Sequence, residues 1–127
     1  MVAQGCGTLG RMSSALISPD GTFEYEAAHG TATRHYRSQQ KGEDTSTNSI
    51  SANLAWTRSL ERRGTIGHTP EIVEFAKKLE DAVIKTVAVD GKMAKDLALA
   101  RGETDRSSYV LTEEFIDFVN ARLQKSL

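Results

Sequence analysis

A stripe of apolar residues in the second half of the chain places the strongest limit on its fold. Its members are separated by three or four residues, which is the spacing of one face of an α-helix: Ile72, Ala76, Leu79, Val83 and Val87. Thr69-Pro70-Glu71 precedes the stripe and has the composition of a helix start, and Gly91 follows it as a terminator. We therefore expect an amphipathic helix that buries this stripe against another element.

Two further segments are helical in character. The first begins near Asn48 or Ser49, and we expect it to stop at Arg62-Arg63-Gly64 because cations followed by glycine suit a helix C-terminus. The second runs from about Thr112 to Lys125. Apolar residues recur in both at helical spacing: Ile50, Leu54 and Leu60 in the first, and Phe115, Val119 and Leu123 in the second.

The first third of the chain has a different pattern. A partly apolar run over residues 13–18 ends at Pro19-Asp20-Gly21-Thr22, a typical turn composition, and residues 23–26 then alternate apolar and acidic side chains. This predicts a strand, a tight turn and a second strand. Residues 27–48 have little periodicity, which indicates a long irregular surface segment. With the helices, the fold class is α/β or α+β, and residues 1–127 are expected to form a single unit because no linker or repeat divides them.

Charge and composition exclude several classes of protein. With 16 basic and 17 acidic residues the formal net charge is −1, so we expect no nucleic-acid partner, and any phosphate recognition must come from a local cluster. No apolar stretch is long enough to cross a bilayer, so we expect no membrane partner. The lone Cys6 suits a reducing compartment, and we expect an intracellular protein, cytoplasmic or mitochondrial.

The segment Gly5-Cys6-Gly7-Thr8-Leu9-Gly10 matches the glycine fingerprint of dinucleotide-binding Rossmann folds. That fingerprint works only between a strand and a crossover helix, which set the pyrophosphate on the helix N-terminus. Only four residues precede Gly5, and Pro19 arrives before a crossover helix could form. We therefore interpret the segment as a glycine turn and not as a Rossmann site.

The run from His29 to His35 concentrates the groups that bind a phosphate ester. Gly30 allows close backbone approach, Thr31 and Thr33 supply hydroxyls, and Arg34 can donate two parallel hydrogen bonds to phosphate oxygens. A protonated His35 beside Arg34 would suit the 2′-phosphate that distinguishes NADP from NAD. Two other interpretations stay open: a merely solvated polar surface, and a zinc site built from Cys6, His29, His35 and His68, which lacks any standard ligand spacing.

Many short motifs along the chain resemble the homodimeric, eukaryotic-type NADP-dependent isocitrate dehydrogenases, in their C-terminal portion. They occur in the family's order and cover nearly the whole chain: Val2-Ala3-Gln4-Gly5, Pro19-Asp20-Gly21, Glu26-Ala27-Ala28-His29-Gly30-Thr31, Thr33-Arg34-His35, Gln40-Lys41-Gly42, Thr45-Ser46-Thr47-Asn48, Ala55-Trp56-Thr57-Arg58 and Lys95-Asp96-Leu97-Ala98. The resemblance implies part of the large α/β domain of the isocitrate/isopropylmalate dehydrogenase fold, which is not a Rossmann fold.

The resemblance also implies roles for individual residues. Residues 30–35 (Gly30, Thr31, Ala32, Thr33, Arg34 and His35) would wrap the ribose-phosphate of NADP, with Arg34 and His35 at the 2′-phosphate. His29 would lie against the nucleotide and Asn48 would meet the adenine. Asp96, and less directly Thr47 and Lys95, would lie at the edge of the same pocket.

The family's reaction is the oxidative decarboxylation of isocitrate to 2-oxoglutarate in the tricarboxylic acid cycle, with reduction of NADP and with Mg²⁺ or Mn²⁺ polarising the carbonyl. The metal aspartates, the substrate-binding residues and the acid/base residues would all precede Val2, so we expect no catalytic residue and no metal ligand here. The chain alone is then an inactive portion of a homodimeric enzyme. The alternatives are a non-catalytic nucleotide-binding module and a piece whose apolar helix faces simply associate.

Overall fold

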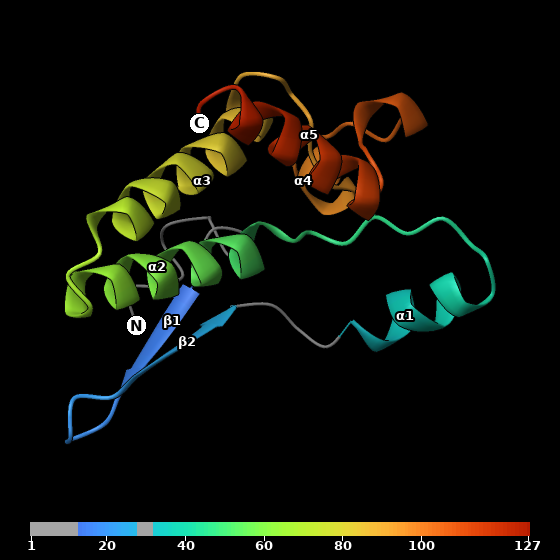
Figure 1. The fold of residues 1–127 in the computed structure, drawn as a ribbon. Helices are drawn as coiled ribbons and strands as arrows, with labels where there is room; N and C mark the ends of the chain where they lie inside the picture. Colours follow the sequence, from blue (N-terminus) through green and yellow to red (C-terminus); the bar gives the residue numbers. More distant parts are fainter. Residues whose placement is uncertain (1–12, 28–31) are drawn as a thin grey trace.

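The computed structural model describes residues 13–27 and 32–127. Its elements follow the order β1 (Ser13–Ile17), β2 (Phe23–Ala27), α1 (Thr33–Gln40), α2 (Ile50–Ile66), α3 (Pro70–Ala88), α4 (Lys95–Ala100), a 3₁₀ turn (Arg106–Ser108) and α5 (Thr112–Gln124). Figure 1 shows the strands on one side of α2 and α3 on the other, with α5 lying across the end of α3. The short α1, which follows β2 and precedes α2 in the sequence, lies away from these stacked elements.

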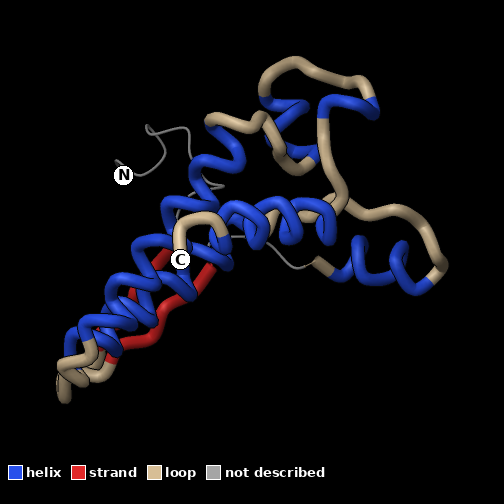
Figure 2. The backbone as a smooth tube through the Cα atoms, turned by 45° about the horizontal axis from the view of Figure 1, so that its top comes forward, coloured by secondary structure: helices blue, strands red, loops and turns tan. Residues whose placement is uncertain are grey.

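The two strands form the antiparallel hairpin that the sequence predicts. Ser13 pairs with Ala27 and Ile17 with Phe23, and the strands run beneath the helices (Figure 2). The turn is closed by Asp20, whose carboxylate accepts hydrogen bonds from the Ser18 hydroxyl and, at 3.0 Å, from the Thr22 amide. These bonds, that from Ser18 first, lower the pKa of Asp20 to about 2 because they stabilise the carboxylate. Prediction of the strand, turn and strand is confirmed.

Helix α2 begins where the sequence predicts but continues past Gly64, which is a correction. Gly64 is buried inside the helix, and a Cβ atom there would lie 2.8 Å from Val73 Cγ2 and 3.1 Å from the Thr69 carbonyl oxygen. The glycine therefore allows α3 to approach α2 closely and does not end the helix. The helix ends at Ile66 instead, with Gly67 as its C-cap, and His68, with φ of 51°, makes the turn into α3.

Helix α3 starts at Pro70, as predicted, and Thr69 precedes it without a capping hydrogen bond from its side chain. The predicted stripe is correct for Ala76 and Val83, which are buried, and for Leu79 and Val87, which pack on the core. It is wrong for Ile72, which is 37% exposed because Val73 takes the place against α2. The stripe also omits Ala82 and Thr86. Thr86 can be buried because its hydroxyl donates to the Ala82 carbonyl at 2.8 Å.

Helix α5 agrees with its prediction, and its inward residues complete the core. Glu114 in its first turn accepts a hydrogen bond from the Leu111 amide at 2.7 Å. One cluster of buried side chains unites α2, α3 and α5: Ile50, Leu54, Ala82, Val83, Phe115, Val119 and Leu123. Because three helices share this core, each is held in place by the other two.

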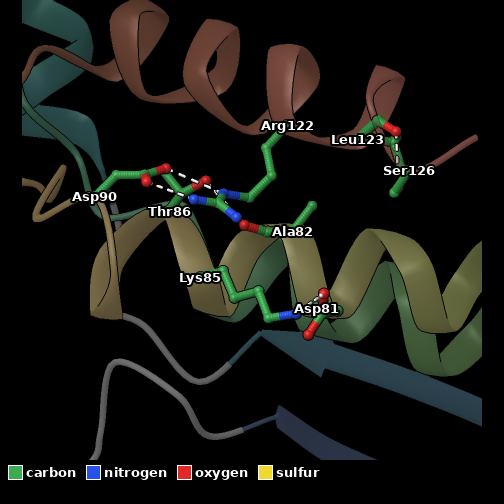
Figure 3. Close-up of polar contacts among 8 residues, drawn as sticks. All are labelled: Asp81, Ala82, Lys85, Thr86, Asp90, Arg122, Leu123 and Ser126. Atoms are coloured by element: carbon green, nitrogen blue, oxygen red, sulfur yellow. Dashed lines mark hydrogen bonds and ion pairs between the residues drawn. The ribbon is translucent and has the colours of Figure 1, made fainter.

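An ion pair fixes the far end of α5 to the end of α3. Arg122 donates from Nε to Asp90 Oδ2 at 3.0 Å and from Nη2 to Oδ1 (Figure 3). Such paired hydrogen bonds constrain orientation as well as distance. Lys85 and Asp81, one turn apart on α3, make a second ion pair at 2.8 Å.

The sequence patterns did not predict α1 or α4, and α1 lies in residues 27–48, which were expected to be irregular. No side chain of α1 is buried, so Thr33–Gln40 carries no apolar stripe that could reveal it. Helix α4 has six residues, of which Ala98 is buried, and it is too short for a repeating pattern. None of the described helices is long and apolar enough to cross a membrane.

The contact at Gly64 gives a prediction about stability. Gly64→Ala should destabilise the fold by about 1–3 kcal/mol, because the new methyl group overlaps Val73 and cannot move away from the Thr69 backbone. The measurement is urea unfolding followed by circular dichroism. Thr65→Ala, at the exposed neighbouring position, is the control and should change stability by less than about 0.5 kcal/mol. An alanine variant as stable as the wild type would contradict the close approach of α2 and α3.

Candidate functional site

The segment Thr45–Asn48 lies between α1 and α2 and is held against the first turn of α5. The Thr112 hydroxyl accepts a hydrogen bond from the Thr47 amide at 2.8 Å, and the Thr112 amide donates to the Thr45 carbonyl at 3.2 Å. These contacts join residues that are more than sixty positions apart in the sequence. The backbone of this segment is therefore positioned by tertiary contacts and not by secondary structure of its own.

The same segment is fixed from a second side by Ser46. Its hydroxyl donates to the Val110 carbonyl at 2.6 Å and accepts a hydrogen bond from the Lys95 amide, at the start of α4, at 2.9 Å. The sequence indicated Ser46 only as part of the family motif at residues 45–48, without a role of its own, and did not indicate Thr112 as a contributor to the site. No local pattern could have revealed them, because their partners lie far along the chain.

Asn48 is oriented by both ends of its amide group. Its Oδ1 accepts a hydrogen bond from the Ile50 amide at 3.1 Å, and its Nδ2 donates to Asp96 Oδ2 at 2.9 Å. The first contact satisfies an amide at the start of α2, and the second reaches the first turn of α4. One N–H of Asn48 then remains for a ligand. The structure thus brings together Asn48 and Asp96, which the sequence resemblance assigns to one pocket.

Helix α1 carries the phosphate-binding candidates in its first turn. Thr33, Arg34 and His35 are all exposed there, and the first turn of a helix leaves its backbone amides without intrahelical partners. The His35 Nδ1 atom lies 2.5 Å from the Thr47 hydroxyl, which links α1 to the segment that ends at Asn48. Within residues 13–27 and 32–127, Arg34 has no hydrogen-bond or ion-pair partner. Its guanidinium group is therefore available to an anion.

The first turns of four helices meet around Thr45–Asn48. His35 of α1, Ile50 of α2, Lys95 of α4 and Thr112 of α5 each contact this segment. Helix N-termini carry partial positive charge. Asp96 in α4 and Glu113 and Glu114 in α5 offset that charge, whereas the first turns of α1 and α2 contain no acidic residue. The N-termini of α1 and α2 thus keep uncompensated partial positive charge, and α1 also carries Arg34 and His35 in its first turn.

A groove of about 530 Å³ lies between α1 and α5, and it is acidic. His35, Thr47 and Thr112 are among the residues that line it, together with four carboxylates: Glu43, Asp44, Glu113 and Glu114. Arg34 is not part of its lining. Charge therefore disfavours a phosphate on the side of this groove that Glu113 and Glu114 form.

Comparisons with known proteins agree with the motifs. The family model described as isocitrate/isopropylmalate dehydrogenase matches residues 1–119. The chain belongs to this family. The α/β fold expected from the sequence resemblance is confirmed at this level.

Relatives within the family carry isocitrate dehydrogenase names. A peroxisomal NADP isocitrate dehydrogenase of Candida tropicalis is 62% identical over all of this chain and 31% of its own length. A mitochondrial one of Saccharomyces cerevisiae is 59% identical over all of this chain and 30% of its own length. An NADP isocitrate dehydrogenase of Mycobacterium tuberculosis is 52% identical over 99% of this chain and 30% of its own length. The chain thus spans less than a third of these family members.

Some predicted residues lie outside the part of the chain that the structure describes. They are His29, Gly30 and Thr31 of the phosphate-binding run, Cys6 of the zinc alternative, and the glycine motif at residues 5–10. Of the run, the structure describes Ala32, Thr33, Arg34 and His35, all exposed. Among residues 13–27 and 32–127 no group of three or more metal-ligating side chains is found.

Proposed function

We propose that this chain is the NADP-binding, C-terminal portion of an isocitrate dehydrogenase. The observation that carries the proposal is the pairing of Arg34 and His35 in the exposed first turn of α1, joined through Thr47 to Asn48. One end of this arrangement offers charged donors and the other an oriented amide. In NADP the adenine and the 2′-phosphate are both attached to one ribose, so neighbouring protein groups can bind them together, and the relatives are named as NADP enzymes.

The 2′-phosphate is assigned to the first turn of α1. Arg34 supplies paired N–H donors, His35 adds a ring nitrogen, and the free backbone amides of the turn add donors along the helix dipole. Charge favours the side of α1 that carries Arg34, which does not line the acidic groove, over the side of the groove that Glu113 and Glu114 form. In this proposal Gly30 to His35 surround the ribose-phosphate, and His29 lies against the nucleotide.

The adenine is assigned to Asn48 and Asp96. Because Asn48 Oδ1 and one N–H of Nδ2 are already engaged, the remaining N–H is the donor that can meet an acceptor nitrogen of the base. Asp96 keeps lone pairs that can accept from the exocyclic amino group of adenine. These two contacts would hold the base at a fixed distance from the phosphate.

The reaction proposed for the complete protein is oxidative decarboxylation of isocitrate to 2-oxoglutarate. Bound NADP supplies the hydride acceptor, and this chain contributes its binding and orientation. The Mg²⁺ or Mn²⁺ ligands and the acid/base residues are proposed to lie on the part of the enzyme that precedes this chain, and the complete enzyme is proposed to be a homodimer. A second candidate is a non-catalytic nucleotide-binding module, which the core shared by α2, α3 and α5 favours.

Replacement of Arg34 tests the phosphate assignment. Arg34→Ala should weaken NADP binding by about 1.5–3 kcal/mol, because charged hydrogen bonds to the 2′-phosphate are lost, and should leave NAD binding nearly unchanged. Isothermal titration calorimetry with both nucleotides measures this difference. The control is Arg37→Ala, one turn further along α1 and equally exposed, which should alter NADP binding much less. Equal losses for NADP and NAD would refute the assignment.

A turnover assay separates cofactor binding from catalysis. The 127-residue chain with isocitrate, NADP and Mg²⁺ should form no NADPH, because the described residues provide no metal ligand cluster and the substrate-binding residues are proposed to lie elsewhere. Absorbance at the NADPH band measures the product. Isocitrate-dependent turnover by this chain alone would contradict the division of roles.

A further inference from the structure

The hydroxyl of Thr112 occupies an unusual place for a residue at the start of a helix. It does not cap α5 but reaches across to a segment 65 residues away, where it accepts from the Thr47 amide at 2.8 Å and donates to the Thr45 carbonyl at 3.3 Å. The Thr112 backbone amide adds a third bond to the same carbonyl at 3.2 Å. A single half-buried residue thus satisfies two backbone groups of the segment that leads to Asn48.

Ser46 makes the complementary set of contacts from the segment itself. Its hydroxyl bridges the Val110 carbonyl, before α5, and the Lys95 amide, at the start of α4. Ser46 lies between the two residues whose backbone groups bond to the Thr112 hydroxyl, so the segment is held through its backbone by Thr112 and through the Ser46 side chain by Val110 and Lys95. The hydrogen bonds of both hydroxyls go to backbone atoms of the protein, so neither hydroxyl is assigned a contact with the proposed nucleotide.

The core does not depend on these hydroxyls. Helix α5 is already held by Phe115, Val119 and Leu123 and by the ion pair between Asp90 and Arg122 at its other end. Loss of one hydroxyl leaves the Thr47 amide or the Lys95 amide without its partner, a local cost at a half-buried position. The segment has no helix or strand of its own that could replace the missing contact.

We propose that Thr112 and Ser46 are positioning residues of the nucleotide site, which act through the backbone of Thr47 and Asn48. This inference rests on the proposed function, because it assumes that Asn48 meets the adenine. Both hydroxyls hold Thr45–Asn48 at the spacing from α1 and α4 that brings Asn48 to Asp96 and Thr47 to His35. The site is therefore preorganised by contacts from α4 and α5, which carry no residue of the phosphate-binding run.

The test compares Thr112→Val, which keeps the shape and removes the hydroxyl, with Thr112→Ser, which keeps the hydroxyl. Thr112→Val should weaken binding of both NADP and NAD by about fivefold, because the adenine half is common to both nucleotides. Thr112→Val should also speed hydrogen exchange of the Thr47 amide. Thr112→Ser should keep the wild-type nucleotide affinity and the wild-type exchange rate. Ser46→Ala is a second variant with the same expected direction. All variants are titrated with NADP and NAD at a temperature below the onset of their thermal unfolding, which circular dichroism measures.

The outcomes separate this inference from the proposed function. If Thr112→Val loses affinity for NADP and NAD alike and Thr112→Ser keeps the wild-type affinity, the positioning role is supported. This result differs from the NADP-specific loss of affinity expected of Arg34→Ala. Wild-type affinity for both nucleotides in Thr112→Val and in Ser46→Ala would overturn the positioning role while the proposed function stands. If the wild-type chain binds neither nucleotide, the proposed function fails and the inference fails with it.

Discussion

The packing of α2 against α3 and α5 is the constraint on which the candidate site depends. Ile50 and Leu54 enter the same buried cluster as Val83 and Phe115, and Ile50 lies two residues after Asn48. Burial of these side chains, each stabilising by about 1.5–3 kcal/mol, therefore fixes the point at which the site begins. Gly64 serves the same packing, because only a residue without a side chain permits the observed approach of α3.

The N-terminal ends of four helices contact the short segment that precedes Ile50. The first turns of α1, α2, α4 and α5 contact Thr45–Asn48, and acidic residues offset the positive ends of α4 and α5 but not those of α1 and α2. In the proposed site the phosphate lies beside Arg34 on α1 and the adenine beside Asn48. The net charge of −1 does not exclude such a local anion site.

The sequence predicted the features that local patterns encode. The hairpin turn at 19–22, the start of α3 at Pro70 and the inward face of α5 follow from residue types within a few positions of one another. It failed for α1, which buries no side chain, and for Gly64, whose role depends on a helix that comes later in the chain. Arg34 and His35 were predicted as phosphate-binding candidates from the chemistry of their side chains, and Asn48 was predicted as an adenine contact from the family resemblance. Thr112 could not be found, because its partner Thr47 lies 65 residues away.

The central claim is that one nucleotide spans α1 and Asn48. Its most direct test is an NMR titration of the labelled chain with adenosine 2′-monophosphate, which carries both the base and the 2′-phosphate. The account predicts the largest shifts at the backbone amides of Thr33 and Arg34, which do not line the acidic groove, and at the side-chain amide of Asn48, with smaller shifts at Glu113 and Glu114, which line it. Shifts that centre on Glu113 and Glu114 and leave α1 and Asn48 unchanged would contradict it.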